Sequence, residues 1–582
     1  MTRLYRIGPG VLLAAAIQIG GPLAAQDTIL AQSTRLSGLV PAAVSAPQMA
    51  LSRALTDRSV ASDAVQAFYA ARDHRPFWMG GDTRWRAALL RSIEAADTHG
   101  LPRSRYAGPH LLALIGSGNS LDAEAALMKT YLDFVNDIAA GVIEPRSADS
   151  EIHIPSEAMP LDAVLARLAG APPRDFFGFA PKTQEYRRLV AELAAMRARR
   201  IERESLAKVP DGRTMRLGYR SDRVVLLRAR LADAVARPQT VDPTTPILIA
   251  AHLPTSHETP QTLASPEAPR TSPAAMVEPE GDVRVYDATL MEAVRRFQAR
   301  NRLTPDGIAG PATLGRLNTD ADDRIGQIIV NLERIRWLHR DPNERHIFVN
   351  QADFTMEFMD GGRVLLASRV VVGKRRHATP EFIDDMDHMV VNPTWHVPYS
   401  IATKEILPAL QQDPTYLERN GMRLVPTGEE PVPDGVTRDF SQFSRAYFPF
   451  RIKQDPSSSN ALGRVKFMFP NQFAIYLHDT PSKSLFNYDQ RTYSHGCVRV
   501  EQPFDLAYAL LQGQVADPQL YFNRLLDREE ERRINLDRPV RVYLTYRTVF
   551  VDRAGVLQFR DDVYGRDERV LARLAEEGVQ PL

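Results

Sequence analysis

A proline-rich segment divides this 582-residue chain and limits what it can fold into. Between Arg237 and Asp282 there are nine prolines among many Ser, Thr and Glu residues. Such a composition buries too little apolar surface to offset the entropy lost on ordering the backbone. We therefore expect a disordered insertion over 237–282. The length alone suggests about four folded units at ~150 residues per domain.

Helical patterns lie on both sides of the insertion. Apolar residues recur on one helical face before and after it, at Val224, Leu227 and Leu231 and again at Leu290, Ala293, Val294 and Phe297. Ser221 is a candidate N-cap for the first of these helices, and Pro311 suits the first position of a third, short helix. We expect a small three-helix domain over 213–318 that the insertion interrupts.

The first residues have the pattern of a secretory signal. Arg3 and Arg6 precede an apolar run over 10–17, and small residues follow up to Ala25. We expect a signal peptide over 1–25 that is removed on export. A retained membrane anchor is the alternative, but the run is too short and too glycine-interrupted for a span of ~20 residues. We expect no transmembrane span in the mature chain.

A flexible linker, rich in Ser, Ala and Pro, is expected over 26–60, followed by a helical domain over 61–210. Apolar residues there keep a spacing of 3.6 residues, for example at Leu127, Tyr131, Phe134, Val135 and Ile138. Trp78, Trp85 and Tyr131 could form a platform for sugars. Aromatic residues at helical spacing more often build a core, and we expect these to do so.

From about residue 323 the pattern changes to strands. Short β-branched and apolar runs separated by turn residues lie at 347–350, 354–358, 365–372, 389–392 and 540–546. Such runs are typical of a mainly β, sandwich-like domain, which we place over 323–565 with a C-terminal tail at 566–582. An insertion at about 399–462 is either a lid beside an active site or a plain surface subdomain. The predicted fold class is multidomain α+β.

Charge and cysteine content exclude two classes of protein. Lys and Arg total 72 against 71 Asp and Glu, so the net charge of +1 gives no field that favours nucleic acid. Cys497 is the only cysteine, so the chain has no intramolecular disulfide framework and carries one free thiol.

The surroundings of this cysteine suggest chemistry. A lone thiol is often only a small buried hydrophobe. Gly496, however, allows a substrate backbone to approach the sulfur, and N–H groups around it can form a concavity for an anion. Upstream, residues 473–478 alternate in polarity like a strand that ends at His478, with Tyr476 on the same face. A nucleophilic thiol needs a base, and His478 is the candidate.

These residues carry a family resemblance. His478, fifteen intervening residues and then Ser494-His495-Gly496-Cys497 resemble the signature of the L,D-transpeptidase (YkuD-type) catalytic domain, whose members are cysteine enzymes that cross-link peptidoglycan stem peptides. The runs 370–374, 379–380 and 392–398 are similar to the large periplasmic members related to YcbB. Residues 286–318 resemble the small peptidoglycan-binding domain, and the helical domain is similar in position to the scaffold region of the large members.

The resemblance implies acyl transfer in the periplasm with no cofactor and no metal. Cys497, made thiolate by His478, would attack the amide between the third and fourth residues of a donor stem tetrapeptide, release D-alanine and pass the acyl group to an amine acceptor. Backbone N–H groups of Gly496 and Cys497, with His495, would hold the oxyanion. His495 could instead only orient the loop. The resemblance also implies that carbapenems acylate Cys497 as donor mimics.

Three further residues are candidates for substrate binding. Arg499 could bind a donor carboxylate through its planar guanidinium group, or it could pair with Glu501. Many smaller family members carry Asn at this position, whereas the large subfamily carries Arg. Tyr476 and Ser494 are candidates for lining the pocket. Peptidoglycan stem peptides are the expected partners, and other wall-synthesis enzymes are candidate partners.

Other activities remain open from the sequence. The same site would serve an L,D-carboxypeptidase, or an enzyme that attaches lipoproteins or exchanges D-amino acids. A zinc hydrolase could use His478, His495 and Cys497 as ligands, although no HExxH motif or spaced cysteine pair supports it. A non-catalytic peptidoglycan-binding scaffold is the alternative of another class, and the three-helix domain could act only as a spacer.

Overall fold

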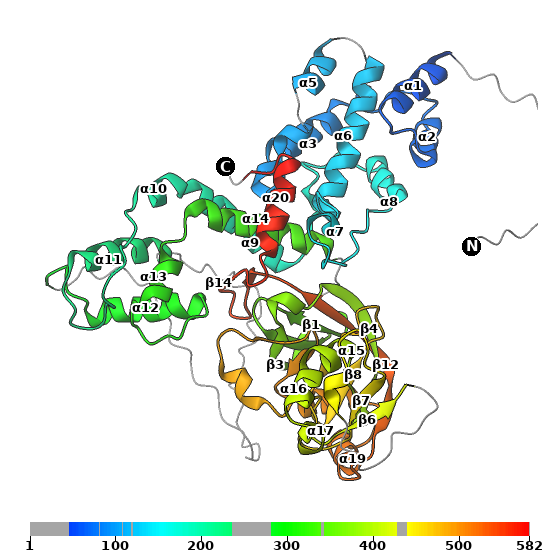
Figure 1. Cartoon of the computed structure of the whole chain (residues 1–582). Coiled ribbons are helices and arrows are strands. Elements are labelled where there is room, and N and C mark those ends of the chain that lie inside the picture. The colour runs from blue at the N-terminus through cyan, green and yellow to red at the C-terminus, as the bar shows by residue number, and fades with distance from the viewer. Residues whose placement is uncertain are drawn as a thin grey trace, which may run out of the picture.

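The computed structural model describes residues 46–80, 82–106, 109–117, 120–235, 281–338, 341, 343–427 and 439–580. The predicted signal peptide, the first part of the predicted linker and nearly all of the proline-rich insertion lie outside the described residues. Figure 1 shows a helical part, a separate group of helices (α11 to α13) and a β-rich part. The fold is therefore multidomain α+β, as the sequence predicts.

The N-terminal part is an all-helical domain. Its helices are α1 (Ala46–Asp57), α2 (Asp63–Ala70), α3 (Thr83–Glu94), α4 (Arg103–Tyr106), α5 (Pro109–Gly116), α6 (Ser120–Ala140), α7 (Pro145–Ala148), α8 (Leu161–Ala166), α9 (Gln184–Ala198) and α10 (Arg200–Ser205). Trp78, Trp85 and Tyr131 are buried in its core. These aromatic residues therefore pack the domain and do not form an exposed platform.

Helix α1 occupies residues for which the sequence predicts a flexible linker. Leu51 and Leu55, one helical turn apart, are both 1% exposed and belong to the core of the helical domain. The linker prediction is corrected here: from Ala46 onward the chain is folded into that domain. The Ser, Ala and Pro content of the range as a whole concealed this short apolar stripe.

Two elements from later in the chain complete the same helical core. Helix α14 (Ala321–Trp337) buries Ile325 and Ile329 in it, and α20 (Arg566–Glu576) buries Val570. Figure 1 shows α20, in red, among the blue and cyan N-terminal helices. The predicted start of the β domain at 323 and the predicted tail from 566 are therefore corrected. Both segments belong to the helical core, a long-range packing that no local pattern reveals.

The three-helix domain forms around its own core, as the sequence predicts. It contains α11 (Asp222–Val235), α12 (Ala288–Arg300) and α13 (Pro311–Leu317). Asp287 caps α12, because its Oδ1 accepts a hydrogen bond from the Leu290 N–H at 2.8 Å. Pro311 stands at the start of α13, where its missing N–H costs nothing.

The β-rich part is a nine-stranded sheet that closes on itself. In spatial order its strands are β10 (Thr492–Ser494), β3 (Arg363–Gly373), β11 (Val498–Val500), β9 (Leu477–His478), β8 (Val465–Met468), β4 (Phe382–Val391), β12 (Arg532–Thr545), β1 (His346–Asn350) and β2 (Thr355–Asp360). The sheet closes because β3 pairs with β2 along its first part and with β11 further on. Helices α18 (Pro503–Leu511) and α19 (Pro518–Leu526) pack on the core that it encloses.

The predicted insertion is a small unit with its own core. It contains the three-stranded sheet β5 (Trp395–His396), β7 (Phe450–Gln454) and β6 (Met422–Pro426), with α15 (Tyr399–Ile401), a π-helical turn η5 (Ala402–Ile406), α16 (Leu407–Gln412) and α17 (Tyr416–Arg419). Its core includes Ile406, Leu410 and Ile452. We refer to residues 395–454 as the lid. Part of it, 428–438, lies outside the described residues.

In the described part of the chain, none of the helices combines the length and the apolar character that a membrane crossing requires.

Candidate active site

Two neighbouring parallel strands carry the predicted histidine and the predicted arginine. In the register of β9 and β11, Leu477 lies beside Val498 and His478 beside Arg499. Leu477 and Val498 are fully buried in the β core. Because side chains alternate along a strand, His478 and Arg499 lie together on the opposite face.

The same alternation places Tyr476 and Cys497, two residues earlier on each chain, on the face of His478 and Arg499. The rings of Tyr476 and His478 confirm it for one strand, since their centroids lie 5.7 Å apart. The Val498 N–H donates to the Tyr476 carbonyl at 3.1 Å and holds the two segments in register. The structure therefore brings together four of the residues that the sequence nominates.

The thiol of Cys497 lies in a dense but partly open environment. The residue is half-buried, and its Sγ lies 3.7 Å from the carbonyl oxygen of Ala474. Burial raises the pKa of Cys497 to about 11, although the N–H and hydroxyl of Tyr476 and the charges of Arg499 and Lys466 each lower it. The resting thiol is therefore protonated at neutral pH.

His478 is held as a neutral imidazole. It is 4% exposed, and its Nδ1 lies 2.5 Å from the carbonyl oxygen of Asp479. A carbonyl only accepts, so Nδ1 carries the proton and Nε2 is left as the basic nitrogen. Burial lowers the pKa of His478 to about 3, assisted by the charge of Arg499, while the carbonyls of Asp479 and Leu462 raise it in part. The ring is a hydrogen-bond acceptor and base in its resting state.

The loop before Cys497 has a conformation that requires glycine. Gly496 has a φ of +122°, and a Cβ there would lie 3.0 Å from Cδ1 of Ile475. The Ser494 hydroxyl accepts a hydrogen bond from the Gly496 N–H at 3.1 Å and donates to the Cys497 carbonyl at 2.5 Å. Ser494 is also buried, so its hydroxyl shapes the loop and does not line an open pocket.

These bonds change the set of donors available to an oxyanion. The sequence predicts the N–H groups of Gly496 and Cys497, but the Gly496 N–H is already donated to Ser494. Within the described residues the Cys497 N–H makes no backbone hydrogen bond and no bond to a side chain. Of the two predicted donors, only the Cys497 N–H is free for a substrate.

His495 connects the loop to the lid. Its Nε2 lies 2.6 Å from Oε1 of Glu405, which belongs to the π-helical turn η5. A carboxylate accepts only, so the Nε2 of His495 carries a hydrogen. The ring centroid also lies 5.4 Å from that of His377. The Nε2 of His495 is therefore bound to the lid, which favours its orienting role. Such π turns are frequent at functional sites.

Two cations, Arg499 and Lys466, lie on the face of the thiol. Arg499 does not pair with Glu501, because Arg369 binds that carboxylate, with its Nε 2.7 Å from Oε2. In the described part of the chain the buried Nε of Arg499 has no hydrogen-bond partner. Lys466 lies beside His478 in the register of β8 and β9, with its Nζ 6.0 Å from the Tyr476 ring centroid.

The sequence reasoning missed Lys466. The run Arg464-Val465-Lys466-Phe467 alternates polar and apolar side chains as a strand does, and this signal was available. Burial lowers the pKa of Lys466, an effect that the charges of Glu531 and Cys497 oppose. A half-desolvated cation of this kind favours an anionic ligand.

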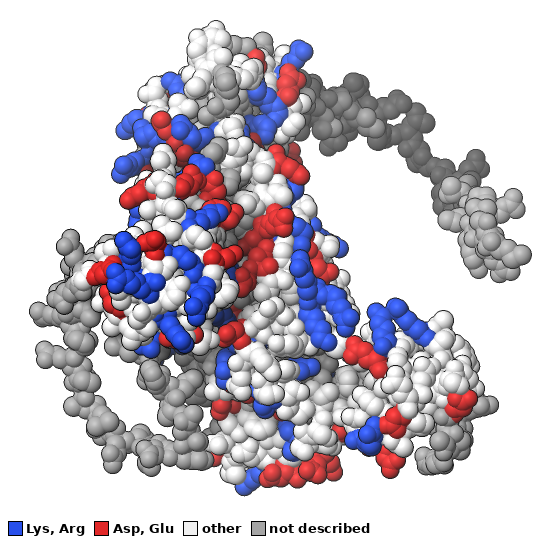
Figure 2. All heavy atoms as spheres, turned by 60° about the vertical axis from the view of Figure 1, so that its left-hand side comes forward, with Lys and Arg blue, Asp and Glu red and all other residues white. Residues whose placement is uncertain are grey.

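More positive charge lies at the rim of the site. His377, in the turn η4 (Arg375–His377), has its pKa lowered by burial and by the charges of His495, Arg376 and Lys404, the last from the lid. Figure 2 shows Lys and Arg side chains on both sides of the hollow between the smaller lobe and the rest of that face. Arg376 and, from the lid, Lys404 therefore place positive charge near His377, which the charge of Glu405 opposes in part.

Among the described residues, no three His, Cys, Asp or Glu side chains are arranged to hold a metal ion, so His478, His495 and Cys497 do not form a zinc-ligand set here. His495 faces Glu405 and His478 faces a backbone carbonyl.

Comparisons with known proteins agree with this organisation. Residues 344–518 match the model of the L,D-transpeptidase catalytic domain (YkuD), residues 63–193 that of a scaffold domain and residues 278–317 that of a "Putative peptidoglycan binding domain". A Haemophilus influenzae protein named "Putative L,D-transpeptidase" is 32% identical over 255 residues, which are 43% of this chain and 50% of that protein. The chain thus spans about half the length of this curated relative.

One solved structure is also similar. The crystal structure of the L,D-transpeptidase (residues 123–326) from Xylanimonas cellulosilytica matches with 14% identity, over 58% of this chain and 99% of that chain, with a TM-score of 0.16. At that score the match supports no argument about this fold.

Proposed function

Because the chain carries an L,D-transpeptidase catalytic domain of the YkuD family together with a scaffold domain and a peptidoglycan-binding domain, we propose that it is a cysteine acyltransferase that cross-links peptidoglycan stem peptides. The observation that carries the proposal is that the only thiol, directly before β11, and a neutral imidazole at the end of the adjacent strand β9 lie on one face. This is the arrangement that nucleophilic catalysis by cysteine requires.

The first step is attack by a thiol that loses its proton as it reacts. Burial disfavours both the thiolate of Cys497 and the imidazolium of His478, so a charged pair is not favoured before substrate binds. Cys497 attacks the carbonyl carbon between the third and fourth residues of the donor tetrapeptide, and the thiol proton moves to Nε2 of His478. The same nitrogen then gives that proton to the departing D-alanine amine.

The second step reverses the first with a new amine. An amine of an acceptor stem peptide attacks the thioester, loses its proton to His478 and releases Cys497 as a thiol. Each step passes through a tetrahedral oxyanion, for which the free Cys497 N–H is the available backbone donor. The energy of the cleaved amide is kept in the thioester, so no nucleotide is needed.

The cations Arg499 and Lys466 are suited to the carboxylates of a donor peptide. Arg499 has a buried Nε without a partner, and a planar guanidinium binds a carboxylate with two hydrogen bonds. A bound donor would therefore satisfy a group that is unsatisfied in the free protein. Lys466, on the same face, adds a second positive charge.

The lid and the other domains bring the donor to this site. Glu405 ties the lid to His495, which belongs to the loop 494–497, here called the nucleophile loop. A lid over bound peptide would exclude water and so favour an amine acceptor. Domains that act on peptidoglycan indicate a location in the cell envelope. We propose the periplasm, reached by removal of residues 1–25, with other wall-synthesis enzymes as partners.

Mass spectrometry of products from purified wall fragments tests the proposal. The protein should convert tetrapeptide fragments into cross-linked dimers with loss of D-alanine, and Cys497→Ala should give no dimer and no covalent intermediate. A carbapenem should add its mass to Cys497 and nothing to Cys497→Ala. Dimer formation by Cys497→Ala, or loss of activity with EDTA but not with thiol alkylation, would show that Cys497 is not the nucleophile.

The same experiment identifies the acceptor. Tripeptide products without dimers would indicate a carboxypeptidase, and incorporation of an added D-amino acid or of a lipoprotein peptide would indicate exchange or attachment. Binding of wall fragments without any product would indicate a non-catalytic scaffold. Each outcome is distinguished by the mass of the product.

A further inference from the structure

A buried threonine outside the catalytic motif holds the nucleophile loop. Thr379 is 0% exposed, and its hydroxyl donates a hydrogen bond to the carbonyl oxygen of Gly496 at 2.6 Å. The same hydroxyl accepts from the Gly373 N–H at 3.0 Å. The buried hydroxyl therefore both donates and accepts a hydrogen bond. The acceptor of the bond that it donates is Gly496, the residue before Cys497.

The segment that carries Thr379 is fixed from several directions. Its own carbonyl accepts from Nη2 of Arg566 at 2.8 Å, and the carbonyl of Pro380 accepts from Nε2 of Gln351 at 3.1 Å. The next residue, Glu381, forms a β-bridge with Ile152 of the helical domain. Thr379 is thus a fixed point from which a neighbouring loop can be held.

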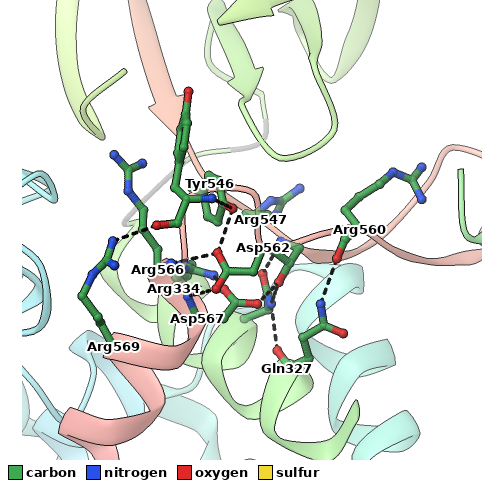
Figure 3. A network of polar contacts seen from close by, with 12 residues as sticks. Gln327, Arg334, Tyr546, Arg547, Arg560, Asp562, Arg566, Asp567 and Arg569 are labelled. Carbon is green, nitrogen blue, oxygen red and sulfur yellow. Dashed lines mark hydrogen bonds and ion pairs between the residues drawn. The ribbon is translucent and has the colours of Figure 1, made fainter. Parts of the chain in front are cut away.

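The fixing groups come from the helical domain and from the C-terminal helix. Figure 3 shows Arg566 and Asp567 from α20 in one network of polar contacts with Arg334 of α14 and Tyr546 from the end of the β domain. Arg566 is buried within 3.3 Å of Glu381 and 3.6 Å of Asp149, a residue of the helical domain. The ion pair of Arg566 with Asp149 and the hydrogen bonds made by Arg566 and Thr379 therefore connect the helical domain to the loop before Cys497.

The planarity of the peptide bond gives this contact a specific consequence. The Gly496 carbonyl and the Cys497 N–H belong to one peptide unit, and in a trans peptide they point in opposite directions. The chain has no cis peptide bond among the described residues. A hydrogen bond that fixes the direction of the Gly496 carbonyl therefore also fixes the direction of the Cys497 N–H.

Without that contact the peptide unit would be easy to rotate. Gly496 has no Cβ and tolerates many backbone conformations, so the chain on its N-terminal side offers little resistance. The Ser494 hydroxyl holds the Gly496 N–H and the Cys497 carbonyl, which belong to the two flanking peptide units. Of the described contacts, the bond from Thr379 is the one that acts on the central unit.

We propose that Thr379 is a positioning residue that aims the Cys497 N–H at the oxyanion of the acyl-transfer reaction. The inference rests on the proposed function, because it assigns the oxyanion donor of that site. A donor displaced by rotation of its peptide unit loses its effect on the transition state, since oxyanion stabilisation depends on preorganised geometry.

Three substitutions of one residue test it. Thr379→Val keeps the shape of the side chain and removes the hydroxyl. Thr379→Ser loses only the methyl group, and Thr379→Ala loses both the methyl group and the hydroxyl. The serine and alanine variants form a matched pair if the valine variant does not fold. Thr545→Val is the control, because the Thr545 hydroxyl, also buried, donates to the Val349 carbonyl at 3.0 Å away from the loop.

Two rates are measured on each folded variant between pH 6 and 10: acylation of Cys497 by a carbapenem or a donor tetrapeptide, and alkylation by iodoacetamide, which needs no oxyanion donor. Thr379→Val and Thr379→Ala should acylate slower by about ten- to a hundredfold, as expected when a catalytic group is misplaced by ~1 Å. Their alkylation should change by less than about twofold, and Thr379→Ser and Thr545→Val should acylate normally.

The pH profile separates this role from others. The fold-loss in acylation rate of Thr379→Val should be the same at every pH, because threonine does not titrate. The fold-loss of His478→Ala should shrink as the pH rises, because the thiol then ionises without help from a base. Equal losses in acylation and alkylation, a loss that disappears at high pH, or an equal loss in Thr379→Ser would overturn the inference. If the unchanged protein alkylates but is never acylated, the proposed function fails instead.

Discussion

The neutral resting state of Cys497 and His478 makes a prediction that separates two ways of activating a thiol. In a preformed ion pair the imidazolium lowers the pKa of the thiol, and the thiol then reacts rapidly at neutral pH. Here burial raises the pKa of Cys497 to about 11 and lowers that of His478 to about 3. We therefore predict slow alkylation of Cys497 by iodoacetamide at pH 7, with little dependence on His478.

The size of the effect follows from these values. A thiol with a pKa of about 11 is ionised in about one molecule in 10,000 at pH 7, against about one in 100 at the ordinary value of 9.0. The rarer thiolate is intrinsically more nucleophilic, by about eightfold for a difference of roughly two pKa units. Alkylation of Cys497 at pH 7 should therefore be about tenfold slower than that of a free cysteine peptide.

Intact-protein mass spectrometry measures this rate without ambiguity, because the chain contains one cysteine. The rate should rise about tenfold per pH unit up to roughly pH 10, without a plateau at lower pH. In His478→Ala the alkylation profile should stay within about twofold, whereas acylation by a donor should fall by about a hundredfold or more near pH 7. A fast plateau between about pH 5 and 8 that vanishes in His478→Ala would show an ion pair and refute the reasoning.

Three further predictions concern neighbours of the thiol. Arg499→Met should raise the pKa of Cys497, because a positive charge that lowers it is lost, and should raise the KM for donor peptide severalfold, with a smaller change in Arg499→Lys; unchanged donor kinetics would refute a role in binding. Gly496→Ala should lower acylation by at least about tenfold, because the φ of +122° costs any other residue roughly 1–3 kcal/mol; a fully active variant would contradict this. Glu405→Ala should lower kcat/KM by only about two- to fivefold, since its bond to His495 is partly exposed, and Glu405→Gln should retain most activity because its amide oxygen still accepts; equal losses in both variants would mean that the charge matters and not the hydrogen bond.

Much of the grouping of these residues could be predicted because side chains alternate between the two faces of a strand. Alternation over 473–478 places Tyr476 with His478, and this holds although only Leu477–His478 forms a regular strand. The sequence places glycine at 496 for close approach of a substrate; its positive φ is a further reason for glycine that only the structure reveals. Residue type and spacing were informative where the constraint lay within a few residues along one strand.

The parts that could not be predicted depend on contacts between distant segments. Nothing near Thr379 in the sequence indicates that its hydroxyl reaches Gly496, and nothing near Glu405 indicates that it reaches His495. The sequence predicts the N–H groups of both Gly496 and Cys497 as oxyanion donors. It could not show that Ser494 accepts the Gly496 N–H, because that bond depends on how the loop folds. Closure of the sheet through β3 and the return of α20 to the helical core also lie beyond local pattern.

The position of Arg566 shows why domain limits taken from sequence mislead in this protein. Arg566 is 0% exposed between Glu381, next to the β domain, and Asp149, in the helical domain. Burial raises the pKa of Glu381, and the charges of Arg566 and Arg334 counter that rise in part. A buried carboxylate that loses its cation is strongly destabilised, so the β domain depends on residues of α14 and α20 to keep Glu381 in place. Because Glu381 is two residues from Thr379, the same helices that complete the scaffold core also support the geometry of the nucleophile loop. The β domain and the helical domain therefore share one buried network across the limits at residues 323 and 565.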